Sequence, residues 1–263
     1  MLRRVGQPVS QSVSQPVVRS PAASREPRVS KVVLQLRRTG ADVAGVLLTV
    51  ALGLGLLAVV VTLRWGVTRV DVLGRTRPFP VLSVGMPAVA ALVCTIPLIR
   101  HAQLEGRLAD VASELAGVEV TVRCETVGEA WVQAHPERGY VMFGADGVPE
   151  RHAVITYDTC QDLQSWVRSD HRNATEDQVL AVHVLSHEAM HMKGLIDEAR
   201  AECAALQRDH RTATLFGATD SEARDLARRY LLSVYPHLPE EYRSADCVPG
   251  GAMDEHLEDS PWA

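Results

Sequence analysis

Apolar and polar positions divide this chain into two parts of different character. Residues 43–63 and 78–99 carry no charged side chain and are rich in leucine, valine and alanine. A helix rises about 1.5 Å per residue, so each segment is long enough to cross a hydrocarbon core of about 30 Å. The first segment predicts a transmembrane helix. The second predicts another, although its prolines at positions 78, 80, 87 and 97 leave a re-entrant or buried hairpin as the alternative.

The segments next to these two spans are polar. Residues 1–42 are rich in Gln, Ser, Pro, Val and Arg and have few large apolar side chains, which favours a disordered tail. Residues 64–77 form a basic connecting loop. The first apolar segment begins some way along the chain, and this distance argues against a cleavable signal peptide.

From residue 100 onward the apolar spacing becomes that of a folded domain. Apolar side chains recur at helical spacing over 104–115, up to Gly117, and residues 118–122 alternate as in a half-buried strand. A Thr175-x-x-Gln178 capping box starts a further helix that ends at Gly194. Residues 100–263 are therefore predicted to form one α+β domain. Its other expected elements are strands over 140–143 and 153–157, joined by a turn at Asp146-Gly147, and helices over 160–167, 198–214 and 221–234.

Charge and cysteine content narrow the possible partners and the location. The net charge is −5, and no basic stripe is interleaved with aromatic residues, so we expect no nucleic-acid partner. Basic residues precede the first span and also fill the loop between the spans, so charge leaves the orientation in the membrane open. The four cysteines of the domain, an even number without CxxC spacing, favour two disulfides and an extracytoplasmic domain. Four unpaired thiols in the cytosol are the alternative. These residues are Cys124, Cys160, Cys203 and Cys247.

The helix over 175–194 carries the most informative motif of the chain. His187-Glu188-Ala189-Met190-His191 reads HExxH. Residues four apart lie on the same helical face, so the imidazoles of His187 and His191 can bind one Zn²⁺ ion. Glu188 falls on the neighbouring face, where its carboxylate can act as general base toward a water that the metal activates.

A catalytic zinc site needs a third protein ligand, and three carboxylates are candidates. If the motif helix and the next helix run antiparallel, Glu198 lies opposite His191 and Glu202 lies opposite His187. We favour Glu198 as the ligand, with Glu202 holding a ligand histidine by a hydrogen bond. Asp197 stays open as an alternative ligand, although a helix-capping role already accounts for it.

Two known patterns resemble this stretch. From His187 to Asp197 the chain reads HExxHxxGxxD, which is similar to the snapalysin branch of the metzincins. Residues 198–202 read Glu-Ala-Arg-Ala-Glu, which resembles the E-x-x-A-D signature of gluzincins such as the CAAX prenyl endopeptidases and membrane-bound heat-shock peptidases, with Glu202 in the place of their Asp. We favour the gluzincin resemblance, because the residues after Asp197 have a helical pattern and no convincing Met-turn follows. The resemblance implies a minimal zincin-like domain.

These observations predict a membrane-anchored zinc metallopeptidase that acts on a peptide or protein substrate. An extended substrate is expected to pair with an edge strand at 153–157, and the loops over 126–138 and 240–263 are expected to shape specificity. His183, one turn before His187, could orient a ligand or touch substrate, but we expect it to be an ordinary helix histidine. Tyr157 and Tyr230 could donate to an oxyanion, although most tyrosines simply pack. The alternative function is a membrane-tethered metal-binding or sensing module with an inactive or structural site.

Overall fold

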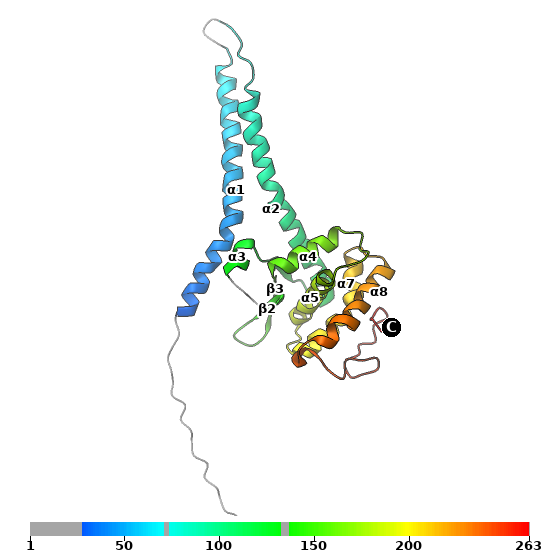
Figure 1. Ribbon diagram of the computed structural model, residues 1–263. Coiled ribbons are helices and arrows are strands. Elements are labelled where there is room, and N and C mark those ends of the chain that lie inside the picture. Colours follow the sequence, from blue (N-terminus) through cyan, green and yellow to red (C-terminus); the bar gives the residue numbers. More distant parts are fainter. Residues whose placement is uncertain (1–27, 71–73, 133–136, 263) are drawn as a thin grey trace, which may run out of the picture.

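The computed structural model describes residues 28–70, 74–132 and 137–262. These residues form an α+β structure with a small three-stranded sheet, so the α+β part of the predicted fold class is confirmed. Figure 1 shows a long helical hairpin that projects from a domain of shorter helices around the sheet. The hairpin and the domain are joined without a linker, because the second hairpin helix continues into the domain.

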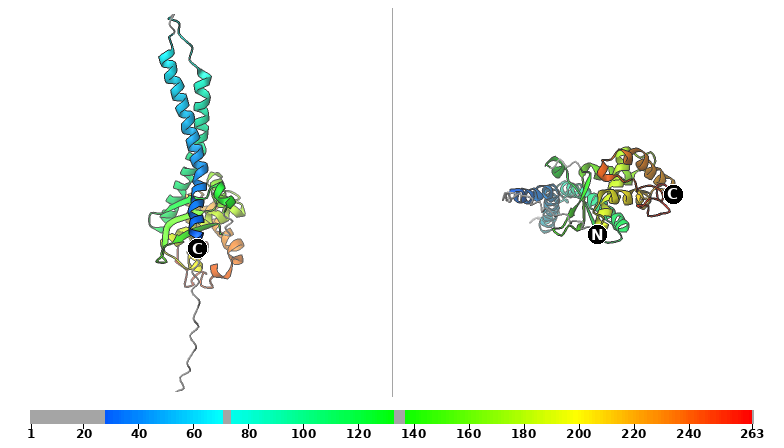
Figure 2. Two further views of the ribbon diagram at one scale, coloured as in Figure 1. Left: turned by 90° about the vertical axis from the view of Figure 1, so that its left-hand side faces the viewer. Right: turned by 90° about the horizontal axis from the view of Figure 1, so that it is seen from below.

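The hairpin consists of α1 (Arg28–Thr68) and α2 (Val81–Ala116), which lie side by side in Figure 1 and in the left view of Figure 2. Each helix contains a stretch long and apolar enough to cross a membrane, judged by length and composition. Many of its large apolar side chains are uncovered by protein; Leu52 and Leu56, for example, are 64% and 65% exposed. Such a surface is typical of a helix that faces lipid.

The two helices are longer than the sequence pattern predicts. Helix α1 begins at Arg28, inside the segment expected to be a disordered tail; residues 1–27 of that tail lie outside the described residues. Helix α2 runs through the expected domain boundary at residue 100 and ends at Gly117, whose φ of 73° suits glycine. No proline follows Pro97 before that glycine, so nothing interrupts the backbone hydrogen bonds at residue 100.

The sheet has the order β1-β3-β2, from β1 (Thr121–Cys124), β2 (Gly139–Phe143) and β3 (Pro149–Ile155). Strand β1 is parallel to β3, and β2 is antiparallel to it. Strand β3 is therefore central, and the expectation that 153–157 forms an edge was wrong. Strands β1 and β2 are the two edges of the sheet, because they pair with opposite sides of β3. Of the two, β2 contacts α5 (Glu176–Lys193), so its outer edge is the one available to a peptide near the HExxH motif.

Helices surround this sheet, and three of them differ from the expected pattern; the helix expected over 221–234 is α-helical only to Arg229. Helix α3 was not predicted, and the helix expected over 198–214 is broken at Gln207 and Arg208, where the chain turns so that Asp209 enters the interior. After the last α-helix the chain makes one π-helical turn, Tyr230–Val234, and two short 3-10 turns, Tyr235–His237 and Glu240–Tyr242. The helices are α3 (Val127–Val132), α4 (Tyr157–Arg168), α5 (Glu176–Lys193), α6 (Glu198–Leu206), α7 (Asp209–Leu215) and α8 (Asp220–Arg229).

Helix α5 is the centre of the domain. It contacts α2, α4, α6, α7 and both strands of the β2–β3 hairpin. Residues on several sides of it are fully buried, among them Ala181, Leu185 and Met190. A helix covered on most sides has a rigid backbone, and the HExxH motif lies in its last turns.

Two disulfides hold the domain together, as the cysteine count predicted. Cys124–Cys160 joins β1 to α4, and Cys203–Cys247 joins α6 to the C-terminal segment. The second bond therefore ties the helix that carries Glu198 and Glu202 to the segment that follows the 3-10 turns. Cys94 lies in the apolar part of α2 and is free.

Candidate metal centre

The local sequence explains how α5 presents its histidines. Thr175 and Gln178 form the predicted capping box, and Gly194 ends the helix with a left-handed φ of 115°. Three residues later Asp197 starts α6 by accepting a hydrogen bond from the Arg200 amide. This tight reversal sets α6 against the last turns of α5.

The reversal brings three predicted metal ligands together. The Nε2 atoms of His187 and His191 are 2.9 Å apart, and each lies 3.2 Å from Oε2 of Glu198. We call these residues the His187–His191–Glu198 cluster; their facing atoms lie close enough together to hold one metal ion. The two histidines are buried, whereas the Glu198 side chain is 38% exposed. The cluster is therefore open to the outside on the Glu198 side.

The far sides of both imidazoles determine which nitrogen carries a proton. Nδ1 of His191 lies 2.7 Å from the carbonyl oxygen of Leu195, which can only accept, so this nitrogen is the donor. Nδ1 of His187 lies 3.0 Å from Oε2 of Glu202 and donates to that carboxylate. In neutral imidazoles both Nε2 atoms then carry lone pairs. Together with Glu198 they form three acceptors that face one another at about hydrogen-bond distance, and a shared cation removes their repulsion.

Without a metal, a proton can serve as that cation. Burial tends to lower the pKa of His187, but the hydrogen bonds that its ring donates to Glu198 and Glu202 outweigh burial and raise it to about 9. Hydrogen bonds from His187 and His191 lower the pKa of Glu198 to about 2. The cluster thus attracts positive charge, which is the property that a cation site needs.

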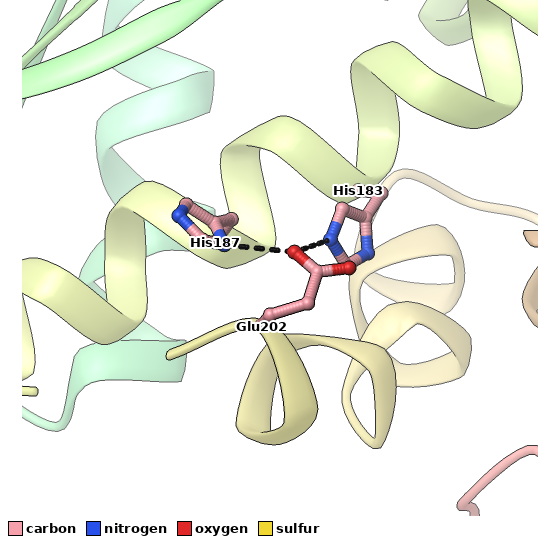
Figure 3. Close-up of side chains that lie close together, drawn as sticks. All are labelled: His183, His187 and Glu202. Atoms are coloured by element: carbon pink, nitrogen blue, oxygen red, sulfur yellow. Dashed lines mark hydrogen bonds and ion pairs between the residues drawn. The ribbon is translucent and has the colours of Figure 1, made fainter. Parts of the chain in front are cut away.

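A second cluster lies directly behind the first, and Figure 3 shows its centre. Oε2 of Glu202 accepts from His187 and also from Nε2 of His183 at 3.0 Å, while Oε1 accepts from the Tyr230 hydroxyl at 2.6 Å. On the other side of its ring, His183 Nδ1 lies 2.8 Å from Oδ2 of Asp209. We call His183, Glu202, Asp209 and Tyr230 the His183–Glu202 network. All four side chains are buried.

The His183–Glu202 network differs from the first cluster in its protons. Burial tends to lower the pKa of His183, but the charges of Asp209 and Glu202 raise it to about 10. The resulting imidazolium donates to both carboxylates, so every facing pair has a donor and an acceptor. His183, His187 and Glu202 also lie close enough to hold a metal ion. Each facing pair of this network already shares a proton, although Oδ1 of Asp209 has no hydrogen-bond partner among the described residues. In the His187–His191–Glu198 cluster, by contrast, neutral imidazoles leave three acceptors facing one another.

Glu188 follows His187 directly and adjoins the His187–His191–Glu198 cluster. It is buried, and its Oε2 has no hydrogen-bond partner among the described residues. Burial raises the pKa of Glu188 to about 7, although the charges of His187 and His191 act in the opposite direction. A buried carboxyl group that titrates near neutrality and lies beside a cation site is suited to exchanging protons with a reacting molecule.

A cleft of about 460 Å³ opens over the cluster. Strand β2 and the 3-10 turns both contribute residues to its lining, and so do the loops over 126–138 and 240–263, through Arg138 and Tyr242. The remaining lining includes Leu180, Val184, Glu188, Leu238 and Pro239. The His187–His191–Glu198 cluster therefore lies at the base of a cavity rather than inside a closed core.

Tyr242 is the residue that the sequence pattern missed. It lines the cleft, its ring centre lies 5.9 Å from that of His187, and its hydroxyl has no hydrogen-bond partner within the described part of the chain. Burial raises its pKa, and the charges of Glu198 and Glu188 raise it further. Of the tyrosines considered earlier, Tyr230 donates to Glu202 and Tyr157 is not among the cleft residues. No local pattern marks Tyr242, because only the fold of the C-terminal segment brings it to the cleft.

Asp197 takes the role of a helix cap. Its Oδ1 accepts from the Arg200 amide at 2.9 Å, and it belongs to neither group of side chains that could hold a metal among the described residues.

Comparisons of the chain with protein-family models, with curated proteins and with solved structures find no match. The chemistry of the site is therefore inferred from its own geometry.

Proposed function

We propose that this protein is a membrane-anchored zinc metallopeptidase. One observation carries the proposal: three acceptor atoms, from His187, His191 and Glu198, converge at the base of an open cleft, with the buried carboxyl group of Glu188 beside them. Two imidazoles and one carboxylate are a ligand set typical of catalytic zinc. When bound, zinc lowers the pKa of a water to about 7 and polarises a carbonyl group.

In the proposed mechanism Glu188 moves the protons. Its free carboxylate takes a proton from the attacking water and then passes it to the nitrogen of the leaving amine. A pKa raised to about 7 supports both steps, because the group is ready to accept and to give a proton near neutral pH. Glu202 and the Leu195 carbonyl keep both Nε2 atoms turned toward the ligand position.

Tyr242 is the proposed donor to the developing oxyanion. Its unpartnered hydroxyl and its position in the cleft support this role. Backbone hydrogen bonds hold its 3-10 turn, among them Tyr242 N–H to the Pro239 carbonyl at 3.1 Å. The Cys203–Cys247 disulfide ties the following residues to α6 and so keeps this turn close to the ligands.

The substrate is proposed to bind as an extended peptide along β2. The Thr156 amide donates to the Arg138 carbonyl, so this pair is hydrogen-bonded across the β2–β3 ladder. Hydrogen-bonded and non-hydrogen-bonded pairs alternate in an antiparallel ladder, so the backbone groups of Gly139 and Val141 point to the outer edge. Both residues line the cleft, and they offer a peptide main-chain partners next to the cluster.

The proposed location is a membrane, with the domain on its oxidising side. The two disulfides support that side, since such bonds persist outside the cytosol. Because α1 and α2 form a hairpin, the N-terminal end of α1 then lies on the same side as the domain. The connection between the helices, which carries Arg69, Arg75 and Arg77, then faces the cytoplasm. Basic residues lie on both sides of the first span, so the disulfides rather than the charges support this orientation.

The deciding experiment uses the full chain, purified in detergent and loaded with zinc. Its metal content is measured by mass spectrometry, and its activity is measured as cleavage of denatured, fluorescein-labelled casein. We expect Glu188→Gln to retain zinc and lose cleavage, and His191→Gln to lose both. The control His101→Gln changes a histidine of α2 outside the cleft and should retain both.

Two outcomes contradict this proposal in different ways. Cleavage that persists in Glu188→Gln would show that this carboxylate is not the base. A wild-type chain that binds zinc but cleaves no protein would favour the alternative function, a membrane-tethered metal-binding or sensing module.

A further inference from the structure

The turn that joins the two hairpin helices carries a positive charge that its own contacts do not balance. Residues 64–80 hold four arginines and one aspartate, whereas residues 43–63 and 81–99 on either side hold no charged side chain. Figure 1 shows this turn at the end of the hairpin far from the domain. The arginines are exposed, and none forms an ion pair with another residue that the structure describes. If Asp71, which lies outside the described residues, neutralised one of them, three would remain. The four are Arg64, Arg69, Arg75 and Arg77.

The backbone of the turn holds two of these arginines opposite each other. An antiparallel β-bridge joins Val70 to Thr76. In that register Arg69 lies directly across from Arg77, and the Arg77 amide donates to the Arg69 carbonyl at 2.8 Å. Side chains that lie opposite each other in an antiparallel pair share one face, and like charges in this position repel. An anion bound between the two guanidinium groups would remove this repulsion.

Two aromatic side chains attach the turn to the ends of the helices. The indole Nε1 of Trp65 donates to the carbonyl oxygens of Arg77 and Pro78, at 3.3 and 3.1 Å. The Trp65 ring also packs edge-on against Phe79, with ring centres 5.0 Å apart. Tryptophan is favoured where lipid chains meet headgroups, because its ring is apolar and its N–H group is polar. The Arg69–Arg77 pair is therefore held next to the depth at which lipid phosphates lie.

A phospholipid headgroup supplies the anion at this depth. We propose that Arg69 and Arg77 together bind the phosphate of an anionic phospholipid, while Arg64 and Arg75 add to the positive charge around it. A guanidinium group suits this task, because its fixed N–H groups can bind phosphate oxygens in pairs. Phosphatidylcholine is a poorer ligand, because the same arginines repel its choline group. This inference rests on the proposed membrane location and not on peptidase activity. In the proposed orientation the site faces the cytoplasmic leaflet, whose surface is negative.

The test measures which lipid lies next to Trp65. The full chain is reconstituted into vesicles of phosphatidylcholine and phosphatidylglycerol in equal amounts, with bromine in the acyl chains of one lipid or the other. Bromine quenches tryptophan fluorescence only at short range, and the other tryptophans belong to the domain, so the quenched signal comes from Trp65. We expect phosphatidylglycerol to be preferred over phosphatidylcholine by at least about fivefold at low salt. The preference should weaken as the salt concentration rises.

Two double variants separate a site from a general attraction. Arg69→Gln with Arg77→Gln removes the facing pair and should abolish most of the preference. Arg64→Gln with Arg75→Gln removes the same charge but keeps the pair, so it is the matched control and should retain most of it. All four side chains are exposed, so both variants leave the core unchanged.

Four outcomes would overturn the proposal. Equal quenching by both lipids in the wild type would show that the turn does not select anionic lipid. Equal losses in the two double variants would replace the site by a diffuse attraction. Displacement by sodium phosphate at constant ionic strength would make a soluble phosphate the ligand. Absence of quenching by either lipid would overturn the membrane location as well, and none of these results bears on the peptidase proposal.

Discussion

Both neighbouring clusters join histidines of α5 to a glutamate of α6, and the second adds Asp209 of α7 and Tyr230 of the π-helical turn, yet their electrostatics differ. In the His187–His191–Glu198 cluster, three acceptor atoms meet beside an open cleft. In the His183–Glu202 network, one buried imidazolium lies between two carboxylates and donates to each. With neutral imidazoles, only the first arrangement lacks a shared hydrogen, and either a metal ion or an added proton supplies the missing positive charge. Proximity of histidines and carboxylates therefore identifies a metal site only when the protons have been assigned.

The largest expected effect separates the two clusters by metal content. His191→Gln removes one Nε2 from the first cluster and leaves the His183–Glu202 network intact, so we expect the full chain to lose its zinc while it keeps its fold. Metal analysis and thermal unfolding of the same sample measure both properties. Wild-type protein should bind one zinc per chain. Two zinc ions per chain would mean that the network is a second metal site.

The next effect concerns Glu202, which belongs to both arrangements. Glu202→Gln puts an amide where the carboxylate accepts from His183, His187 and Tyr230. We expect zinc affinity to fall by about 10–100-fold, because the amide holds His187 less firmly. Competition with a fluorescent chelator gives this number. Unchanged affinity would show that His187 needs no support from Glu202, and Glu255→Gln, on the surface pair with Arg208, is the matched control.

His183 should affect stability without affecting the metal. His183→Asn removes the cation between Glu202 and Asp209, and breaking such a buried pair costs about 3–5 kcal/mol. The folded-state pKa of about 10 lies above the ordinary value of 6.5. The contribution of His183 to stability is thus complete below pH 6.5 and is lost as pH rises through about 10. Chemical unfolding at several pH values should show this trend in the wild type and not in the variant, with zinc content unchanged in both at pH 7.

A smaller effect tests how tightly β2 is packed against the base. In Gly139→Ala the new methyl group would meet Val184, Glu188 and Ile155 at 2.9–3.1 Å. We expect a loss of about 1–3 kcal/mol in unfolding free energy and a lower kcat, because Glu188 must move. Gly128→Ala is the control: its methyl group would meet only Thr126 at 4.0 Å, inside a helix where alanine is favoured. Equal behaviour of the two variants would contradict the close contact.

The smallest effect concerns Asp197. Asp197→Ala removes a cap from α6 and should cost about 1 kcal/mol, with zinc affinity preserved. Denaturant unfolding and chelator competition measure the two quantities. A loss of bound zinc in this variant would instead identify Asp197 as a ligand, as in the HExxHxxGxxD pattern. Asp225→Ala, on the exposed face of α8, provides the comparison.

Local signals accounted for much of the fold. The capping box at Thr175, the glycines at 117 and 194 and the spacing of the HExxH motif act over one or two turns, and each was found where expected. The expectation for the sheet was less successful, because strand order depends on contacts between segments far apart in the chain. Pairing with both β1 and β2 makes β3 central, although no residue of β3 encodes that position.

The amino-acid sequence alone was enough to identify a polar helix with two imidazoles on one face, two apolar spans and an even number of cysteines in the domain. These features depend only on the spacing and the number of residues. The sequence could not choose among Asp197, Glu198 and Glu202. That choice depends on the angle between α5 and α6, which the buried packing of both helices sets. The proton arrangement around His183 and the approach of Tyr242 likewise arise only when distant segments enclose a common interior, because burial and charge act through space rather than along the chain.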